Sequence, residues 1–253
     1  MVRYLDINQA GNSIKCKLFC EAIREIEHLI IFAHGFGGHK DNKAAERFAE
    51  TALSKMKKTA VLVFDWPCHG TDVKKKLTLE DCDSYLGMVI DYAGEQLKAK
   101  KISAYGTSFG GYLLLKYVHE HGANPFGKIA LRCPAVDMGE VMYKRVMTDE
   151  NKSMLERGRE VMVGFDRKVL INQEFMDKLM AADIRKWEYF DYADDILILH
   201  GSKDEIVPIE ECRNFAESNV IEFVEIEDAD HRFQDLNKMK LAHSYMVDFI
   251  NKK

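Results

Sequence analysis

A serine between glycines is the feature of this sequence most able to carry chemistry. The stretch GTSFGG occupies residues 106–111, after the apolar run KISAY and before the apolar run YLLLKYV. We predict a strand for the first run and a helix for the second, which places Ser108 on a sharp strand-to-helix turn. In this setting the G-x-S-x-G pattern favours an exposed nucleophile over a purely structural turn.

A serine hydroxyl is a weak nucleophile unless a base takes its proton and a further group orients that base. Asp204 follows the apolar run ILILHG, and His231 follows the run EFVEIED. Both residues come at the carboxyl ends of predicted strands, the edge at which sites form in open α/β sheets. We therefore expect Ser108, His231 and Asp204 to form a catalytic triad, with Glu205 as an alternative acid.

Acyl transfer also needs hydrogen-bond donors for the negative oxygen that develops in the transition state. The stretch HGFGG, residues 34–38, directly follows the strand-like run LIIFA, and its glycines allow a turn with N–H groups directed into a site. The backbone N–H groups of Phe36 and Phe109 are the predicted donors. We interpret His34 and His200, which precede glycines at strand ends, as structural residues.

Nucleotide and metal sites have little support in the sequence. The stretch HGFGGHKD lacks both G-x-G-x-x-G and the Walker pattern. Asp65, Cys68, His69 and Asp72 are close together in FDWPCHGTD, but one loop without a second cluster is a poor metal site. We expect neither a metal nor a cofactor. Cys68 is a candidate reactive thiol, with loop packing as the simpler interpretation.

Short runs rich in Val, Ile and Leu alternate with amphipathic stretches along the chain. The predicted strands cover 3–8, 13–19, 28–35, 59–66, 102–108, 128–135, 195–204 and 220–228, and the predicted helices cover 42–56, 78–100, 109–122, 209–219 and 236–252. Gly11-Asn12 is a hairpin turn between the first two strands. This alternation predicts an α/β fold over 1–253, with a mostly parallel central sheet flanked by helices on both faces.

One connection is much longer than a crossover helix requires. About 60 residues separate Ala135 from Asp195, whereas a crossover needs roughly a dozen or slightly more. We expect residues 137–193 to form a lid inserted into a single domain. A helix over MGEVMYKRVM, a hairpin turning at 164–167, and a helix running from the cap Asn172 to Ala182 are predicted within it.

The side chains of this insertion suggest what it covers. Seven of the twelve methionines lie in it, and flexible, polarizable side chains suit a lid that adapts to apolar ligands. Packing of the insertion onto the domain is the alternative explanation. Trp187, Tyr189 and Phe190 are interpreted mainly as core of the next helix–strand junction.

The composition of the chain argues against several classes of binding partner. Hydrophobic residues make up 47% of the 253 and the net charge is −5, so no basic footprint points to nucleic acid. The longest aliphatic runs are about five residues, against roughly 20 for a membrane span. The polar N-terminal stretch and six cysteines without a C-x-x-C pair indicate a soluble, cytoplasmic protein. The acidic balance also argues against strongly anionic substrates.

The motifs HGFGG, FDWPCHGTD, GTSFGG, HGSKDEIVP and DADHRF occur in an order and spacing that resemble the α/β-hydrolase superfamily over nearly the whole chain. FDWPCHGTD is similar to the D-x-x-G-H-G loop of that family. The resemblance implies an α/β-hydrolase fold with Ser108 as nucleophile, His231 as general base and Asp204 as orienting acid. It also implies backbone donors at Phe36 and Phe109, and a lid before the strand that carries the acid.

Among subgroups, the chain most resembles bacterial carboxylesterases of the cinnamoyl/feruloyl-esterase and monoacylglycerol-lipase-like branch. Their HGF-type loops are followed by a basic, polar stretch, as in HGFGGHKD. Thr107 departs from the histidine that many of them place before the nucleophile. The resemblance implies a serine carboxylesterase that cleaves small to medium carboxylic esters without a cofactor.

Two other functions stay open. An aminopeptidase of the proline-iminopeptidase type would need an acidic cluster to hold the substrate amine. The insertion supplies candidates at Asp149, Glu150, Glu156, Glu160, Glu174 and Asp177. A non-catalytic binding protein on the same fold is the second alternative, although such relatives typically lose a triad member.

Overall fold

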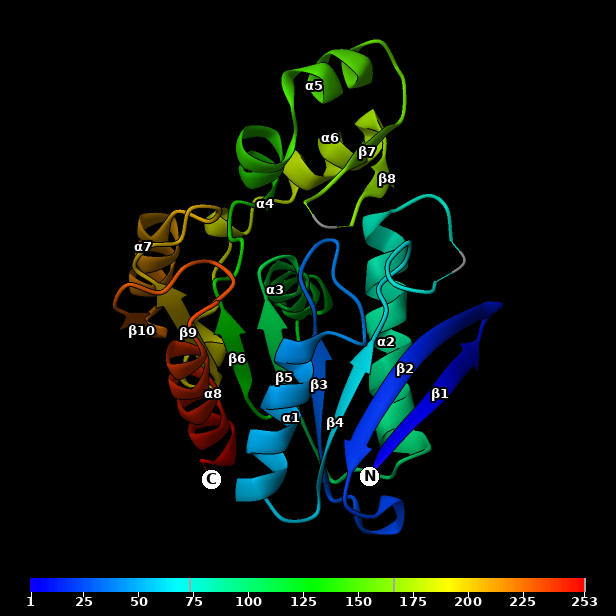
Figure 1. Ribbon diagram of the computed structural model, residues 1–253, viewed down its shortest axis with the longest axis vertical. Helices are drawn as coiled ribbons and strands as arrows, with labels where there is room; N and C mark the ends of the chain where they lie inside the picture. The colour runs from blue at the N-terminus through cyan, green and yellow to red at the C-terminus, as the bar shows by residue number, and fades with distance from the viewer. Residues whose placement is uncertain (73, 166, 253) are drawn as a thin grey trace.

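The computed structural model describes residues 1–72, 74–165 and 167–252, and an eight-stranded sheet forms its centre (Figure 1). The strands are β1 (Val2–Gln9), β2 (Asn12–Cys20), β3 (His28–Ala33), β4 (Thr59–Phe64), β5 (Lys101–Thr107), β6 (Ile129–Arg132), β9 (Ile196–Gly201) and β10 (Glu222–Ile226). They lie in the order β1-β2-β4-β3-β5-β6-β9-β10. β2 pairs antiparallel with both of its neighbours, and the pairs from β4 to β10 are parallel. The predicted hairpin and the mostly parallel sheet are both confirmed.

Helices cover both faces of the sheet. α1 (Lys43–Lys55) and α8 (Leu236–Asn251) pack on one face, and α2 (Leu79–Glu95), α3 (Phe109–His121) and α7 (Ile209–Asn219) pack on the other. β3 is buried along its whole length, with Ile30 and Phe32 in the core under α1 and α8. Leu29 and Ile31 face the opposite core. Burial on both faces explains the continuous apolar runs of the central strands.

Glycines allow α3 to pack unusually close to the sheet. A Cβ atom on Gly110 would lie 2.1 Å from the carbonyl oxygen of Ala33 in β3. A Cβ atom on Gly106 would lie 2.8 Å from the Cα of Gly111. Real side chains do not tolerate such distances to backbone atoms, so the start of α3 and the end of β5 depend on these two glycines.

The long insertion lies above the carboxyl ends of the parallel strands (Figure 1). It contains α4 (Met138–Val141), a π-helical turn (Met142–Val146), α5 (Asp149–Glu156), β7 (Val161–Val163), β8 (Val169–Ile171) and α6 (Gln173–Ala181). β7 and β8 pair antiparallel, as the sequence predicts, although Asp166 in their connection lies outside the described residues. α5, which Thr148 begins with a reciprocal capping box, is not among the helices predicted from the sequence.

Most methionines of the insertion pack inside it. Met142, Met147 and Met176 are buried in the core, while Met162 and Met180 are exposed. From the sequence we predict that Trp187, Tyr189 and Phe190 belong to the core where the insertion leads into β9. This is right for Tyr189, which is buried, and wrong for Phe190, which is 54% exposed. Trp187 is partly buried and stacks on the ring of His119, 4.2 Å between centroids.

None of the helices in the described ranges is long and apolar enough to cross a bilayer.

We expect Gly110→Ala to destabilise the fold by about 2–3 kcal/mol or more, because the added methyl group must displace either β3 or α3. The melting temperature measures the effect. Gly94→Ala is the matched control, since Gly94 is also helical and a Cβ there meets nothing within 4 Å. It should leave stability unchanged or raise it by less than about 1 kcal/mol. Equal effects of the two substitutions would contradict the close-packing argument.

Candidate active site

Ser108 occupies a strained turn at the carboxyl end of β5. Its backbone has φ 50° and ψ −116°, a positive φ that a residue with a Cβ atom adopts only under constraint. The N–H of Ser108 donates to the carbonyl of Arg132 over 3.1 Å, and its carbonyl accepts from the N–H groups of Tyr112 and Ala135. These bonds and the close approach of α3 hold the turn, which leaves the hydroxyl at the edge of the sheet.

His231 and Asp204 meet in a direct hydrogen bond. They lie in the loops that follow β10 and β9, and 2.7 Å separates the His231 Nδ1 from the Asp204 Oδ2. The Asp204 side chain is completely buried, whereas that of His231 is 14% exposed. Because an ionised carboxylate only accepts, Nδ1 carries the proton and Nε2 is left as the basic nitrogen.

Asp204 has several donors besides His231. Its Oδ1 accepts from the N–H groups of Ile206 and Val207, over 2.9 and 2.8 Å. Its Oδ2 also lies 3.1 Å from the Nε2 of His200. Burial alone would raise the pKa of Asp204, but the hydrogen bonds from His200 and His231 outweigh it and hold that pKa well below its usual value. Asp204 is therefore charged wherever the protein is folded near neutral pH.

The structure separates the two candidate acids. Asp204 contacts the imidazole of His231, while the Glu205 carboxylate lies 3.3 Å from the backbone N–H of His231. His200, interpreted from the sequence as a structural residue only, also contacts Asp204. Its Nε2 faces two acceptors, Asp204 and the carbonyl of Val207, so Nε2 carries the proton. Asp204 comes four positions after His200, and this short spacing is the one signal for the contact that the sequence contains.

The 34–38 loop forms a tight turn beside Ser108. The N–H of Gly38 donates to the carbonyl of Gly35 over 2.9 Å, with Phe36 inside the turn. Phe109 opens α3, so its N–H has no carbonyl one turn earlier in the helix. The rings of Phe36 and Phe109 contact each other edge to face, 5.6 Å between centroids. The structure thus brings together the two residues whose N–H groups are the predicted oxyanion donors.

A buried carboxylate fixes the 34–38 loop to the loop after β4. Asp65 accepts hydrogen bonds from the N–H of Lys40 (2.7 Å), the ammonium of Lys40 (3.2 Å) and the N–H of Thr71 (3.0 Å). A Cβ atom on Gly70 would lie 2.3 Å from this carboxylate. Asp65 therefore has a structural role in positioning the loop that carries Phe36.

Several other side chains near the site could react or bind a metal, but burial keeps them neutral. Burial lowers the pKa of His34 to about 3 and that of His69 to about 4, so both are neutral. Burial, with the nearby charge of Asp72, raises the pKa of Cys68 to about 12, which makes a reactive thiolate there unfavourable.

Cys133, His200 and Asp204 present ligand atoms within 4.8 Å of one another. Burial raises the pKa of Cys133 well above its usual value, so its thiol is a poor metal ligand.

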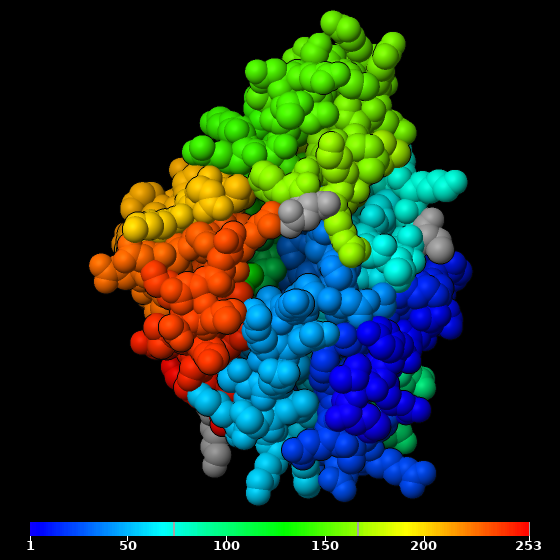
Figure 2. Space-filling view, in the orientation of Figure 1, coloured from blue at the N-terminus to red at the C-terminus, as the bar shows by residue number. Residues whose placement is uncertain are grey.

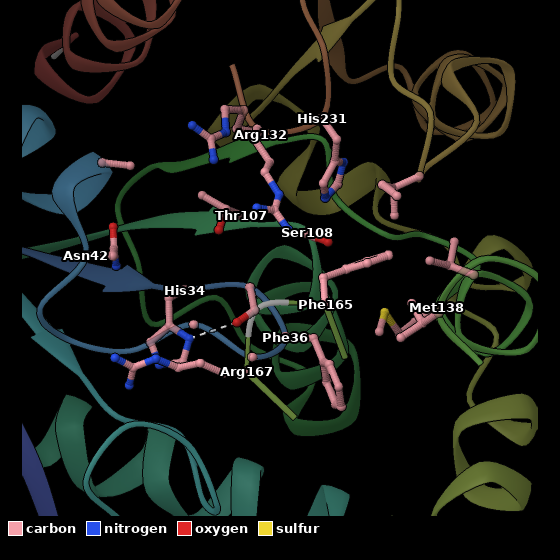
Figure 3. Close-up of a pocket in the computed structure, with 18 of the residues that line it drawn as sticks. His34, Phe36, Asn42, Thr107, Ser108, Arg132, Met138, Phe165, Arg167 and His231 are labelled. Atoms are coloured by element: carbon pink, nitrogen blue, oxygen red, sulfur yellow. Dashed lines mark hydrogen bonds between the residues drawn. The ribbon is translucent and has the colours of Figure 1, made fainter. Parts of the chain in front are cut away.

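Ser108 and His231 line one cavity of about 290 Å³ (Figure 3). Figure 2 shows the hollow where the C-terminal loops, the loop after β3 and the insertion meet. In the close-up, Met138 and Phe165 lie on one side of Ser108, and Asn42, Thr107 and Arg132 lie on the other. Val141, Val146 and Ile206 add further apolar side chains to the lining. The arrangement can bring an ester or amide carbonyl to a serine, a histidine base and two N–H donors.

Solved structures with a similar fold match almost the whole chain. Est1E from Butyrivibrio proteoclasticus, with ferulic acid bound, has a TM-score of 0.79 at 20% identity, covering 98% of this chain and 100% of that one. The esterase domain of a Rhodothermus marinus protein has a TM-score of 0.72 at 19% identity, covering 98% and 97%. A soluble variant of monoglyceride lipase from Saccharomyces cerevisiae has a TM-score of 0.74 at 14% identity, covering 98% and 94%. No curated protein sequence matches the chain.

A family model described as the alpha/beta hydrolase fold matches residues 28–157, just over half of the 253 residues. The matched segment begins with β3 and includes the 34–38 loop, the strained turn at Ser108 and α3. The large, mostly parallel sheet flanked by helices agrees with this match. The chain therefore belongs to the α/β hydrolase fold family.

Proposed function

We propose that this protein is a serine hydrolase, a carboxylesterase that forms an acyl-enzyme on Ser108. The observation that carries the proposal is the buried hydrogen bond between Asp204 and His231, which leaves the Nε2 of His231 basic in the cavity that Ser108 lines. The strained turn at Ser108 supports it, because such a turn presents the hydroxyl to solvent and to substrate.

The proposed reaction has two halves. The Nε2 of His231 takes the hydroxyl proton as Ser108 attacks the ester carbonyl, and the backbone N–H groups of Phe36 and Phe109 bind the oxyanion. His231 then gives that proton to the leaving alcohol, and the acyl group stays on the serine. Water, deprotonated by His231, attacks the acyl-enzyme, and the acid leaves as the proton returns to Ser108. Asp204 holds the imidazole in one tautomer throughout, and the cycle needs no cofactor.

The cavity supports small to medium esters. About 290 Å³ bounded by an apolar side suits a short or compact acyl or alcohol group. We propose that the insertion, 137–193, acts as the lid, since Met138, Val141, Val146 and Phe165 of this segment line the cavity. Est1E with ferulic acid and monoglyceride lipase with a substrate analogue share the fold, which makes esters the favoured substrate class.

The aminopeptidase alternative has weaker support. It requires a carboxylate near the nucleophile to bind the substrate amine, and none of the six acidic residues named for it in the insertion lines the cavity of Ser108. Arg132 and Arg167 line it instead, and their positive charges repel an ammonium group. A non-catalytic role is also less favoured, because Asp204 and His231 retain a hydrogen bond that binding alone does not require.

The six cysteines are unpaired in the structure, which agrees with the proposed cytoplasmic location.

We expect Ser108→Ala to lower kcat by at least about 10³-fold on 4-nitrophenyl acetate, butyrate and octanoate, because it removes the nucleophile. Initial rates with each ester measure the loss. Ser54→Ala, in the exposed part of α1, is the matched control and should keep the wild-type rate. A serine-reactive phosphonate should label Ser108 in mass spectrometry. Wild-type rates in Ser108→Ala would contradict the assignment, and cleavage of aminoacyl arylamides alone would favour the aminopeptidase.

Asp204→Asn should lower kcat by about 10³–10⁴-fold, because the amide no longer favours a proton on Nδ1 of His231. It should also change the pH dependence of stability. The pKa of Asp204 is lower in the folded than in the unfolded chain, so its carboxylate stabilises the fold above the unfolded pKa of about 4 and this stabilisation is lost as the pH falls further.

Urea unfolding checks this second effect. The difference in unfolding free energy between wild type and Asp204→Asn should shrink from about pH 5 to pH 3. Asp191→Asn, at an exposed position, should show no such change and controls for the loss of one charge. A constant difference over this range would mean that the Asp204 carboxylate does not stabilise the folded state.

A further inference from the structure

The polar side of the cavity contains a buried arginine. Arg132 ends β6, pairs with Thr107 across the sheet and is 8% exposed. Its guanidinium lies 5.3 Å from the centre of the Phe233 ring, and its Nη1 donates to the sulfur of Met239 over 3.1 Å. A thioether sulfur is a weak acceptor, so neither contact neutralises the charge.

Within the described part of the chain Arg132 lacks a countercharge, since no carboxylate there forms an ion pair with it. Its buried Nε has no hydrogen-bond partner. Two polar atoms of its surroundings, the Tyr105 hydroxyl and the His243 Nε2, are also buried without a partner. Burial, together with the charge of Arg132, lowers the pKa of His243 to about 3, so this neighbour is neutral. An uncompensated buried cation is costly, which points to an anion that is present when the protein acts.

The cavity around Arg132 is positive. Arg167 also lines it, and among the described residues its lining includes no Asp or Glu. Figure 3 shows Arg132, Thr107 and Asn42 on one side of Ser108, and Met138 and Phe165 on the other. A ligand that fills the cavity therefore meets a cation at one end and apolar side chains at the other, with the serine between them.

We propose that the substrate is a small ester with a terminal carboxylate or phosphate, which Arg132 binds while Ser108 attacks the ester carbonyl. This inference rests on the proposed esterase function and specifies its substrate class. A planar guanidinium binds either anion through two parallel hydrogen bonds, so the shared chemistry is a terminal oxyanion. The sequence-based argument against anionic substrates used the net charge of −5, but the local charge at the serine has the opposite sign.

Two matched pairs of esters test the proposal and distinguish the two halves of the substrate. Mono-4-nitrophenyl glutarate and 4-nitrophenyl pentanoate differ in a charge on the acyl side. 4-Acetoxybenzoate and its methyl ester differ in a charge on the alcohol side. We expect the wild-type protein to prefer the charged member of one pair by about 10- to 100-fold in kcat/KM, the range expected for a hydrogen-bonded charge pair. Rates with Ser108→Ala are subtracted as the background.

The variants assign the preference to Arg132. Arg132→Met should bring the charged-to-neutral ratio close to 1, and Arg132→Lys should keep part of it. Arg3→Met, which removes an exposed positive charge on β1, should keep the wild-type ratio. Arg132→Met should melt no lower than wild type without ligand, since it removes an unpaired buried charge. A lower melting temperature with an unchanged ratio would show a structural role and overturn the proposal, as would the lack of a preference in both pairs.

A binding measurement separates this inference from the esterase proposal. Glutarate or inorganic phosphate should raise the melting temperature of Ser108→Ala but not that of the same protein with Arg132→Met. If no ester is hydrolysed and this shift is present, the esterase proposal fails and the anion site stands. If esters are hydrolysed without a charge preference and the shift is absent, the esterase proposal stands and buried water, not a substrate anion, solvates Arg132.

Discussion

The close packing of α3 against β3 and β5 is the constraint on which the site depends. It requires Gly110 to approach the carbonyl of Ala33, and it forces the chain at Ser108 into a positive φ. The same turn puts the N–H of Phe109 at the start of α3 and the serine hydroxyl above the sheet. The loops after β3, β9 and β10 then need only reach this one point, because they all leave the same edge of the sheet.

Two buried charged side chains near Ser108, those of Asp204 and Arg132, differ in the partners that surround them. Asp204 has four donors, two from the backbone and two from histidines, which favour its ionised form. Arg132, one strand away, has a sulfur atom and an aromatic ring in place of an acceptor of full charge. A charge that positions another side chain has its hydrogen-bond partners within the protein. A charge that binds a ligand must keep its hydrogen-bonding atoms available for that ligand. This contrast distinguishes the proposed orienting acid from the proposed anion site.

The regular elements and the order of the candidate residues could be predicted from the sequence because both depend on local patterns. Continuous apolar runs indicate the buried strands, and a serine between glycines indicates the turn at Ser108. The same reasoning missed α5, whose polar residues carry little apolar periodicity, and the contact of His200 with Asp204. Packing, one of the two explanations for the methionines of the insertion, holds for Met142, Met147 and Met176, which lie in the core, while Met138 lines the cavity.

By itself the sequence determined the fold family, the strands and helices, and the residue types that acyl transfer needs, since periodicity and short motifs are properties of neighbouring residues. Only the tertiary structure decided that Asp204 rather than Glu205 contacts the imidazole of His231. It also decided that Arg132 lies buried in the cavity of Ser108 with no carboxylate of the described residues paired to it. The physical reason is that charge pairing depends on distances between residues from different strands. Net charge and composition average over those distances, so they do not report the local charge of one cavity.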